Sequence, residues 1–341
     1  MIIKKFEEKD YQSLINYNTV VFNQRDKIEE SIKYRFYANP FALNRQQKSL
    51  IAWDKEQNII GQILVMHSEF SYEGKVYPAF LGMDYFVNVE ARKSLTGVIL
   101  ANKYKDLKYN FGVGLTDASL KVLLAFNVNI IGYLAKYIKI NITFALKNYF
   151  LENDVSRPNN FVFPVSIKVK GGNFSRVFSP EKIVSREGYW NSKLLEFTRN
   201  KEFLSWRYFY YPDKYIIYKF DSSSHNIDTE PVYFVVRHIV WKKTNCLLLV
   251  DYRFNTTQKN TFNEIIDSVV KLSKKLKMSA TLLGCSLPGF KKTLRNKLFF
   301  NFGRDLEIVS KFPLSTSSDS DTIFVTFGDS DCDFYYGNNK W

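Results

Sequence analysis

Hydrophobic and polar residues alternate along the first 140 residues in a way that predicts a mixed order of helices and strands. Residues 6–17 and 25–38 carry apolar side chains every three or four positions, which is typical of helices with one face on a core. SLIAWD and IIGQILVMHSEF alternate with period two on either side of residues 55–58 and predict a hairpin, and VYPAFLGMDYFVNV, from Val76, predicts a long strand. The pattern then predicts a helix at LTGVILANKYKDLKY, a strand at FGVGL, a helix at ASLKVLLAF and a strand at IIGYLAKYI.

Two similar heptapeptides indicate that the chain contains a duplication. YRFYANP contains Arg35 and WRYFYYP contains Arg207, and the two arginines are 207 − 35 = 172 residues apart. The glycines of FGVGLTDASL and LLGCSLPGF show the same offset, 284 − 112 = 172, and the DY pairs of LGMDY and LLVDY are separated by 251 − 84 = 167. A repeat of this length is too long for a solenoid and is typical of a duplicated domain. We interpret each heptapeptide as the same corner of the fold, with the arginine fixing the turn and the proline ending a helix.

The second half of the chain repeats part of this order and completes the expected architecture. NCLLLVDYRF and MSATLLGCSL predict strands, with a helix at FNEIIDSVVKLSKKLK between them. We therefore expect the α/β (α+β) fold class with two tandem domains, each a mixed, mostly antiparallel sheet flanked by helices. The expected ranges are 1–145 for the N-terminal domain, 146–185 for a linker and 186–341 for the C-terminal domain.

The charge of the chain allows a partner that carries phosphates. Its 341 residues include 48 Lys and Arg against 34 Asp and Glu, a formal net charge of +14, but the basic residues are spread out rather than gathered in runs. Three cysteines and three histidines are scattered singly, so their spacing assembles no metal site. The charged N-terminus and the interrupted apolar tracts predict a cytoplasmic protein without a membrane span.

The segment VNVEARKSLTGVIL, residues 87–100, overlaps the end of the predicted long strand and is the most informative motif. Together with the order of elements, it resembles the GNAT superfamily of acyl-CoA-dependent N-acyltransferases, whose members grip the pyrophosphate of coenzyme A in a loop of the form R-x-x-G-x-G or A. Arg92 and Gly97 fit this pattern, and Leu95 stands where the first glycine is usual. The physical reason is that a helix N-terminus presents unpaired N–H groups and the positive end of the helix dipole to an anion.

The resemblance covers most of residues 1–140 and implies a set of coenzyme A contacts. Asp117 takes the place of the family's usual asparagine, and Leu124 lies where many members have a tyrosine that protonates the departing thiolate. A backbone N–H at Phe86 or Val87 would polarise the thioester carbonyl. The residues expected to bind coenzyme A are Phe86, Val87, Arg92, Lys93, Ser94, Leu95, Thr96, Gly97, Asp117 and Ser119.

Two residues are candidates for the base that deprotonates the incoming amine. Asp84 lies on the long strand, where parity predicts that it shares a face with Gly82 and Phe86. Asp251 occupies the matching place in the second copy, so a repeated structural role for the DY pair is the alternative. His67, in the predicted strand LVMHSEF, is the other candidate, with a hydrogen-bonded or surface histidine as the alternative. The opposite face of the long strand is predicted to carry Leu81, Met83, Tyr85 and Val87.

The second copy is expected to bind the acceptor or to close the cleft. Its connection NTTQKNT has neither glycine nor arginine, so coenzyme A is assigned to the first copy. The tail DTIFVTFGDSDCDF resembles that of tandem GNAT proteins from bacterial surface-polysaccharide clusters. Asp329 and Asp331 would hold sugar hydroxyls or an ammonium group, and Arg207 is the candidate for a substrate phosphate. A solvated turn and a structural arginine are the alternatives.

These observations lead to one functional prediction and two alternatives. We predict an N-acyltransferase that moves an acyl group from acyl-CoA to the amine of a nucleotide-linked amino sugar in surface glycan synthesis, with neither a metal nor a nucleic acid as partner. The first alternative is a transferase resembling the FemABX group, which also doubles the GNAT fold but takes aminoacyl-tRNA. The second is a degenerate GNAT pair that binds a ligand without catalysis.

Overall fold

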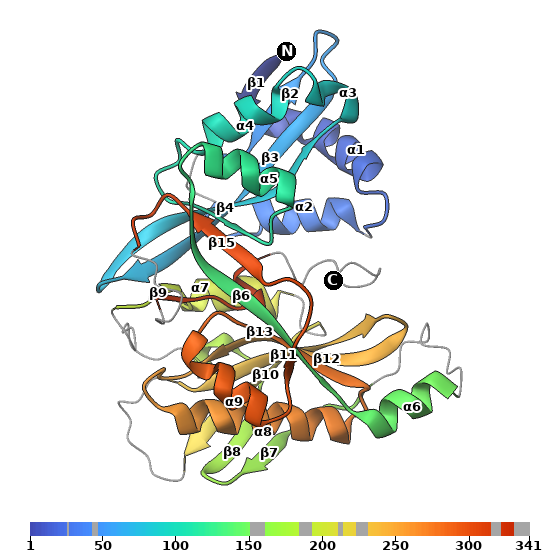
Figure 1. The fold of residues 1–341 in the computed structure, drawn as a ribbon, viewed down its shortest axis with the longest axis vertical. Helices are drawn as coiled ribbons and strands as arrows, with labels where there is room; N and C mark the ends of the chain where they lie inside the picture. Colours follow the sequence, from blue (N-terminus) through green and yellow to red (C-terminus); the bar gives the residue numbers. More distant parts are fainter. Residues whose placement is uncertain are drawn as a thin grey trace. The chain divides into compact units, whose positions relative to one another are not determined.

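The computed structural model describes residues 1–25, 27–42, 47–150, 161–183, 193–210, 214–222, 231–314 and 322–330 (Figure 1). The chain divides into two compact units. Unit 1 comprises residues 1–133, 196–198 and 306–318, and unit 2 comprises residues 134–195, 199–305 and 319–341. Each unit therefore takes in segments from both halves of the chain.

Unit 1 has a mixed sheet of order β1-β2-β3-β4-β5-β15, in which β4 and β5 are the parallel pair. The helices and strands predicted for this part of the chain all have counterparts, and β1, which pairs with β2, was not predicted. The elements are β1 (Ile2–Lys5), η1 (Glu8–Asp10), α1 (Tyr11–Val21), α2 (Ile28–Phe36), β2 (Leu50–Trp53), β3 (Ile59–Tyr72), β4 (Lys75–Val87), α3 (Val89–Arg92), α4 (Thr96–Tyr104), β5 (Asn110–Val113), α5 (Asp117–Ala125), the start of β6 (Asn129–Ile140), the end of β9 (Leu195–Phe197) and β15 (Leu306–Ser310).

The helices of unit 1 lie on both faces of its sheet. Helices α4 and α5 lie in front of the strands in Figure 1, and their buried residues Leu100 and Leu123 share one hydrophobic core with Ile63 of β3. The other face of β3 meets α1, where the side chains of Asn18 and Gln62 exchange two hydrogen bonds of 3.0 Å. Because successive side chains of a strand point to opposite faces, neighbouring residues of β3 reach the two helix layers in turn.

A β-bulge in β4 changes which side chains share a face. In the register of β3 with β4, two residues of β4, Asp84 and Tyr85, lie opposite Ile63 alone. Asp84 has a φ of 48°, in the left-handed region. The alternation predicted for this strand is therefore wrong after Met83. Met83 and Asp84 both contact α2, whereas Tyr85 and Val87 point into the opposite core, under α4.

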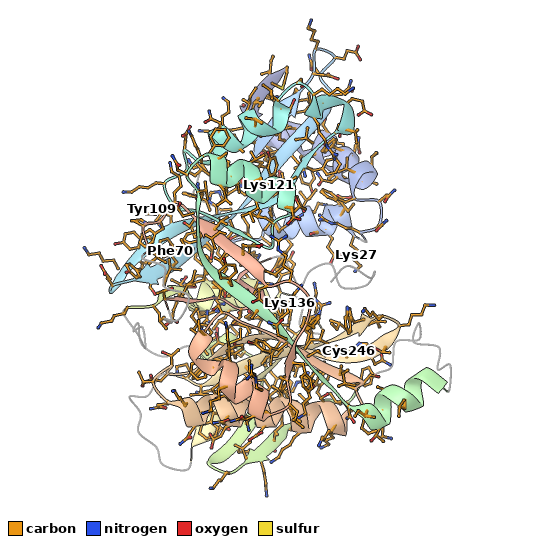
Figure 2. The ribbon with its side chains drawn as sticks, in the orientation of Figure 1. Lys27, Phe70, Tyr109, Lys121, Lys136 and Cys246 are labelled. Carbon is orange, nitrogen blue, oxygen red and sulfur yellow. The ribbon has the colours of Figure 1, made fainter. Side chains whose placement is uncertain are left out.

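An aromatic cluster joins the three separate chain segments of unit 1. The ring centroid of Phe70 in β3 lies 5.0 Å from that of Phe111 in β5 and 5.1 Å from that of Phe312, which follows β15. Phe111 in turn lies 5.3 Å from Phe197 of β9. Figure 2 labels Phe70 and another member of the cluster, Tyr109, at a ring distance of 5.9 Å. Aromatic side chains bury large apolar areas, so Phe197 and Phe312 attach the segments that carry them to the core of unit 1.

Unit 2 has a second mixed sheet, of order β6-β13-β12-β11-β10-β8-β7, in which β12 and β13 are the parallel pair. Strands β12 and β13 and helix α8 were predicted, whereas β7 and β8 fall inside the range predicted as a linker. The elements are the end of β6, α6 (Ile142–Phe150), β7 (Ser166–Val169), β8 (Gly172–Val177), η2 (Pro180–Lys182), α7 (Lys201–Leu204), η3 (Ser205–Phe209), β10 (Ile216–Ser222), β11 (Tyr233–Trp241), β12 (Thr244–Arg253), α8 (Lys259–Lys275), β13 (Ala280–Cys285), η4 (Pro288–Phe290), α9 (Lys291–Asn296), β14 (Phe300–Asn301), β16 (Ile323–Phe324) and η5 (Phe327–Asp329).

Helix α8 packs its apolar face against the sheet of unit 2. Its sequence places apolar residues every three or four positions, so Phe262, Ile266 and Val269 lie on one side of the helix. All three are fully buried in one core with Leu247 and Leu249 of β12. Burial of each such side chain contributes roughly 1.5–3 kcal/mol, and this packing fixes β12 under the helix.

Each sheet is completed by a strand from the other half of the chain. Strand β15 follows α9 in sequence but pairs with β5 of unit 1, with Val309 opposite Gly112. Strand β6 follows α5 in sequence, but its later residues pair with β13 of unit 2, with Ala135 opposite Cys285. The compact units therefore differ from the two continuous ranges expected from the sequence.

The heptapeptides that suggested a duplication both overlap helical segments. YRFYANP covers the end of α2, and WRYFYYP covers most of η3, a helical turn that directly follows α7. Arg35 and Arg207 are both buried. Their partners differ, because Arg35 donates to Asp84 of β4 whereas Arg207 donates to the backbone carbonyls of Gly328 and Ser330.

The predicted fold class, with mixed, mostly antiparallel sheets flanked by helices, is confirmed. The parallel pair in each sheet connects through helices, α3 and α4 in unit 1 and α8 in unit 2. Within the described parts of the chain, no helix combines the length and the apolar character needed to cross a bilayer.

Candidate active site

The parallel pairing of β4 with β5 stops before β4 ends. Residues 80–82 of β4 pair with residues 110–112 of β5, whereas β4 continues to Val87 and β5 ends at Val113. Both strands run in the same direction and a helix follows each, so the connections after them lie at the same edge of the sheet. The carboxyl edge of parallel strands is a common place for ligands in folds of this kind.

The backbone of β4 offers a hydrogen-bond donor on the side where the strands separate. Asn88 N–H donates to Ile60 O of β3 at 3.0 Å. Because N–H groups alternate in direction along a strand, Phe86 N–H also points to β3 and Val87 N–H points to the side of β5. Val87 O, which points the same way, accepts from Arg92 Nε at 3.1 Å. Of the two donors predicted from the sequence, Val87 is thus the one that faces the separation.

Helix α4 begins shortly after β4 and presents its N-terminus at this edge. Leu95, which precedes the helix, has a φ of 59° and a ψ of 14°, a left-handed conformation that glycine adopts at lower cost. Lys93, Ser94 and Leu95 are exposed, and Thr96 is buried. The first N–H groups of a helix have no partner inside the helix, so together with the basic residues Arg92, at the end of α3, and Lys93 they suit a phosphate group.

Tyr85 ties the first turn of α4 to the bulge of β4. Its hydroxyl donates to Gly97 O at 2.6 Å. A Cβ atom at Gly97 would lie 3.0 Å from that hydroxyl oxygen, so a larger residue would push Tyr85 aside. Burial raises the pKa of Tyr85 to about 12, and the phenol therefore keeps its proton at neutral pH. The glycine predicted from the motif thus has a packing reason for lacking a side chain.

The start of α5 follows β5 at the same edge. Thr116 caps this helix, because Ser119 N–H donates to Thr116 Oγ1 at 3.3 Å and Thr116 Oγ1 donates to Ser119 Oγ at 2.9 Å. Asp117, the first helical residue, is exposed. The structure thus brings the residues predicted to bind coenzyme A, those of 86–97 together with Asp117 and Ser119, to one edge of the sheet of unit 1.

Asp84 lies in a buried ion-pair cluster. Its side chain is 2% exposed, and its two oxygens accept from Arg25 Nη1 at 2.6 Å and from Arg35 Nη1 at 2.8 Å. Burial alone would raise the pKa of Asp84, but the guanidinium groups of Arg35 and Arg25 outweigh burial and hold the pKa below its ordinary value. A carboxylate held in this way is a weak proton acceptor. The contacts therefore favour a structural role for the DY pair over a role for Asp84 as the base.

His67 is buried in β3 and lies away from Asp84. Its partner in the register with β4 is Phe80, whose ring it meets edge-on at a centroid distance of 5.3 Å. Asp84 is four residues further along β4, about 13 Å at the rise of a strand. Asn39 Nδ2 donates to His67 O at 2.9 Å. The two candidates for the base therefore do not form one site.

Two of the residues predicted to bind the acceptor, Asp329 and Arg207, lie in unit 2, where they contact other protein groups. Asp329 is buried and forms an ion pair with Arg199. Arg207 is buried and donates to Tyr215 Oη at 2.9 Å and to the carbonyls of residues 328 and 330. Asp331 lies outside the described residues. The contacts of Asp329 and Arg207 favour the structural alternative for both.

Two tyrosine hydroxyls that link β4 to α4 in unit 1 were not predicted from the sequence. The hydrophobic pattern placed Tyr85 in a predicted strand and Tyr104 in a predicted helix, and it assigned no role to either hydroxyl. The available signal was a pair of glycines, since each of these hydroxyls fills the space that a glycine leaves. A Cβ atom at Gly82 would lie 2.6 Å from Tyr104 Oη, just as one at Gly97 would crowd Tyr85.

Comparisons with solved structures identify the fold. The chain is similar to Saccharomyces cerevisiae N-myristoyltransferase with bound myristoyl-CoA, with a TM-score of 0.56, 12% identity and coverage of 92% of this chain and 83% of that chain. It is similar to a protein from Enterococcus faecalis described as a probable N-acyltransferase, with a TM-score of 0.56, 12% identity and coverage of 91% and 72%. It is also similar to a GCN5-related N-acetyltransferase from Anabaena variabilis, with a TM-score of 0.55, 10% identity and coverage of 90% and 72%.

No protein-family model matches the sequence, and no curated protein matches it. At identities of 10–12% the structural likeness shows the fold alone. That fold is the one found in N-acyltransferases of the GNAT type, in agreement with the resemblance carried by the loop after β4.

Proposed function

We propose that the chain is an acyl-CoA-dependent N-acyltransferase whose donor binds at the carboxyl edge of β4 and β5 in unit 1. The observation that carries the proposal is the end of the β4–β5 pairing, beyond which Val87 N–H faces the separation and α4 presents its N-terminus. The exposed basic loop and the bare Gly97 fit the pyrophosphate of coenzyme A. A solved structure of the same fold contains myristoyl-CoA, which supports a thioester of coenzyme A as the donor.

In this proposal, separate groups of unit 1 hold the donor and polarise it. The first N–H groups of α4, with Arg92 and Lys93 nearby, bind the pyrophosphate. Val87 N–H donates to the thioester oxygen, on which negative charge develops as the amine attacks. The amine nitrogen forms a bond with the carbonyl carbon, the carbon–sulfur bond breaks, and the leaving thiolate takes up a proton to become the thiol of coenzyme A.

Asp84 serves in this proposal as an anchor for the strand that carries the donor N–H group. Its ion pairs with Arg25 and Arg35 attach α2 and the segment before it to the bulge of β4, three residues before Val87. His67 is turned towards Phe80 and contributes to the core. The proton of the incoming ammonium group then passes to water, which can reach the open carboxyl edge.

We propose an amino sugar, carried on a nucleotide and used in surface glycan synthesis, as the acceptor. The support is the resemblance of the tail around Asp329 to tandem GNAT proteins of polysaccharide clusters. The net charge of +14 suits the phosphates of a nucleotide carrier. The acceptor rests on different evidence from the donor and has a separate test.

Calorimetric titration with coenzyme A tests the donor site. The wild-type protein is expected to bind one equivalent. Gly97→Leu is expected to lower the affinity at least about 100-fold, or about 2.8 kcal/mol, because the new side chain displaces Tyr85 and enters the N–H cradle.

Asn260→Leu is the matched control for this titration. It places the same side chain at the second residue of α8, the helix that follows β12, as Gly97 is the second residue of α4. We expect the control to bind coenzyme A as the wild type does. Retained affinity in Gly97→Leu, or a comparable loss in Asn260→Leu, would contradict the assignment of the loop.

A panel of acceptors then distinguishes the proposed function from its alternatives. Transfer from acetyl-CoA is measured with nucleotide-linked amino sugars and with a peptide amine, and binding is measured with tRNA. Turnover with an amino sugar supports the proposal. Binding of tRNA without binding of coenzyme A would favour the FemABX-like alternative, and binding of coenzyme A without turnover of any amine would favour a binding module.

A further inference from the structure

A tyrosine hydroxyl is bonded to both β4 and β5 at the point where their pairing ends. Phe80 N–H donates directly to Tyr109 O at 2.9 Å. The next N–H on that side of β4, that of Gly82, which belongs to the last pair of the ladder, also donates to Tyr104 Oη at 2.9 Å. Tyr104 Oη donates in turn to Phe111 O of β5, at 2.7 Å. The hydroxyl thus adds a bridge between the two strands at the last pair of the ladder, where the strands separate.

This bridge is built into the fold of unit 1. Tyr104 is the last residue of α4 and is 3% exposed. Gly82 leaves the space that the hydroxyl fills, because a Cβ atom there would lie 2.6 Å from Tyr104 Oη. Phe80 O, at 3.0 Å, is a second acceptor for the hydroxyl. Burial raises the pKa of Tyr104, so the phenol keeps the proton that it donates.

We infer that the Tyr104 hydroxyl is a positioning group for acyl transfer, which fixes the point where β4 separates from β5 so that Val87 N–H meets the thioester carbonyl of the donor. The inference rests on the proposed function. Tyr104 reacts with nothing itself, because its hydroxyl is already bonded to both strands. Its effect on the donor therefore passes through the direction in which β4 leaves β5.

Helix α4 connects the proposed pyrophosphate site to the Tyr104 bridge. Its first turn, at Gly97, belongs to the proposed pyrophosphate site, and its last residue, Tyr104, is bonded to the end of the strand pairing. One rigid helix of nine residues therefore fixes the place where the phosphates bind relative to the place where β4 separates from β5. The thioester carbonyl must fall between these two points.

Infrared spectroscopy of bound acetyl-CoA, labelled with ¹³C at the carbonyl, tests the inference without turnover. A hydrogen bond from Val87 N–H lowers the stretching frequency of that carbonyl. Tyr104→Phe keeps the ring and removes the bridge. We expect this variant to bind coenzyme A within about threefold of the wild type, to lose most of the frequency shift, and to lower kcat at least about tenfold.

Two further variants sharpen the test. Tyr85→Phe is the matched control, because it removes a buried hydroxyl that holds the start of α4 instead; it is expected to weaken coenzyme A binding and to keep the carbonyl shift. Gly82→Ala displaces the hydroxyl from the side of the strand and is expected to lose the carbonyl shift and lower kcat as well. It therefore tests the inference if Tyr104→Phe fails to fold. Combining Gly82→Ala with Tyr104→Phe should cost no more than the worse single change, because both act on one contact.

The outcomes separate this inference from the proposed function. An unchanged carbonyl frequency and kcat in both Tyr104→Phe and Gly82→Ala would overturn the inference. A loss of coenzyme A affinity that accounts for the whole loss of activity would also overturn it, since that is the result of a merely structural role. Failure of the wild-type protein to bind coenzyme A overturns the proposed function itself.

Discussion

The two units place a DY pair at the same point of their long strands, beside a β-bulge and next to a parallel neighbour, but the two tyrosines turn in different directions. In unit 1, Tyr85 is partly buried and donates to Gly97 O in the helix that follows β4. In unit 2, Tyr252 is fully buried and donates at 3.0 Å to Gly284 O of the parallel neighbour, β13.

This difference closes in unit 2 the place that is open in unit 1. Tyr252 meets the rings of Phe262 and Phe324 at centroid distances of 5.6 Å, and both phenylalanines belong to the hydrophobic core of unit 2. The end of the parallel pair is therefore filled by the protein's own side chains. In our proposal, the same topology thus provides a ligand edge in unit 1 and a closed core in unit 2, and the direction of one tyrosine distinguishes them.

The aspartates of the two pairs differ in their access to water. Asp251 is fully buried and accepts from Arg199 Nε at 2.8 Å and from Tyr208 Oη at 2.7 Å. Asp84 is also buried, but one of its partners, Arg25, is 24% exposed. The cluster of unit 2 is therefore closed, whereas that of unit 1 opens to solvent on one side.

Removal of either aspartate should cause the largest loss of stability among these predictions, and the loss should be larger for Asp251 than for Asp84. Asp251→Ala removes one of the two buried carboxylates, Asp251 and Asp329, that pair with Arg199 and Arg253, so it is expected to lower the free energy of unfolding by about 3–5 kcal/mol. Asp84→Ala is expected to cost less, because Arg25 can turn to water. Urea unfolding followed by circular dichroism measures both, and a larger cost for Asp84→Ala would break the comparison.

Removal of the Tyr252 hydroxyl should lower stability without changing coenzyme A binding, whereas removal of the Tyr85 hydroxyl should mainly weaken that binding. Tyr252→Phe leaves Gly284 O buried without that donor and is expected to lower the free energy of unfolding by about 1–3 kcal/mol, with coenzyme A affinity unchanged. Tyr85→Phe is expected to cost less stability and to weaken coenzyme A binding. Melting temperatures and calorimetric titrations of the same preparations test this, and the reverse assignment of effects would refute it.

Acid should weaken the closed cluster of unit 2. Burial alone would raise the pKa of Asp251, but Arg199 and Arg253 outweigh it and lower the pKa. A lowered pKa stabilises the folded state above the unfolded value of about 3.9, and that stabilisation is lost as the pH falls below it, by at most about 1.4 kcal/mol per pH unit for one proton. Between pH 5.5 and pH 3, the urea midpoint of the wild type should therefore fall more than that of Asp251→Asn. If the urea midpoints of the two proteins fall equally between these pH values, the Asp251 carboxylate does not contribute to the loss of stability in acid.

The smallest expected effect is a gain of stability at the start of α4. Leu95 is exposed and has a left-handed backbone, so Leu95→Gly is expected to raise the free energy of unfolding by up to about 1 kcal/mol without weakening coenzyme A binding. Gln258→Gly, at the matching position before α8, is the control and should give no gain, because Gln258 has a φ of −100°. A loss of stability in Leu95→Gly would count against the loop conformation.

Local patterns were sufficient to predict the elements that carry the site. The hydrophobic spacing marked β4, α4, β5 and α5, because each of these elements has one face on a core and the signal lies within a few consecutive residues. The order of strand, loop and helix, together with the resemblance of the loop to the GNAT superfamily, led to the prediction of an anion site at residues 92–97, which the N–H groups of a helix start would provide.

Other features depend on contacts between distant residues and could not be predicted. The bulge at Asp84 is set by the register of β3 with β4, and it reverses the face of every later residue of the strand. The pairing of β15 with β5 joins segments almost 200 residues apart, as in Ser310 Oγ to Asn110 O. The bridge at Tyr104 requires three backbone groups from two strands, which no sequence spacing reveals.

Hydrogen–deuterium exchange with and without coenzyme A tests most directly whether unit 1 alone holds the donor. Slower exchange is expected over residues 93–99, the loop and first turn of α4, with no change over residues 256–262, at the start of α8. Protection of both segments, or of the α8 segment alone, would contradict the assignment of the donor site to unit 1.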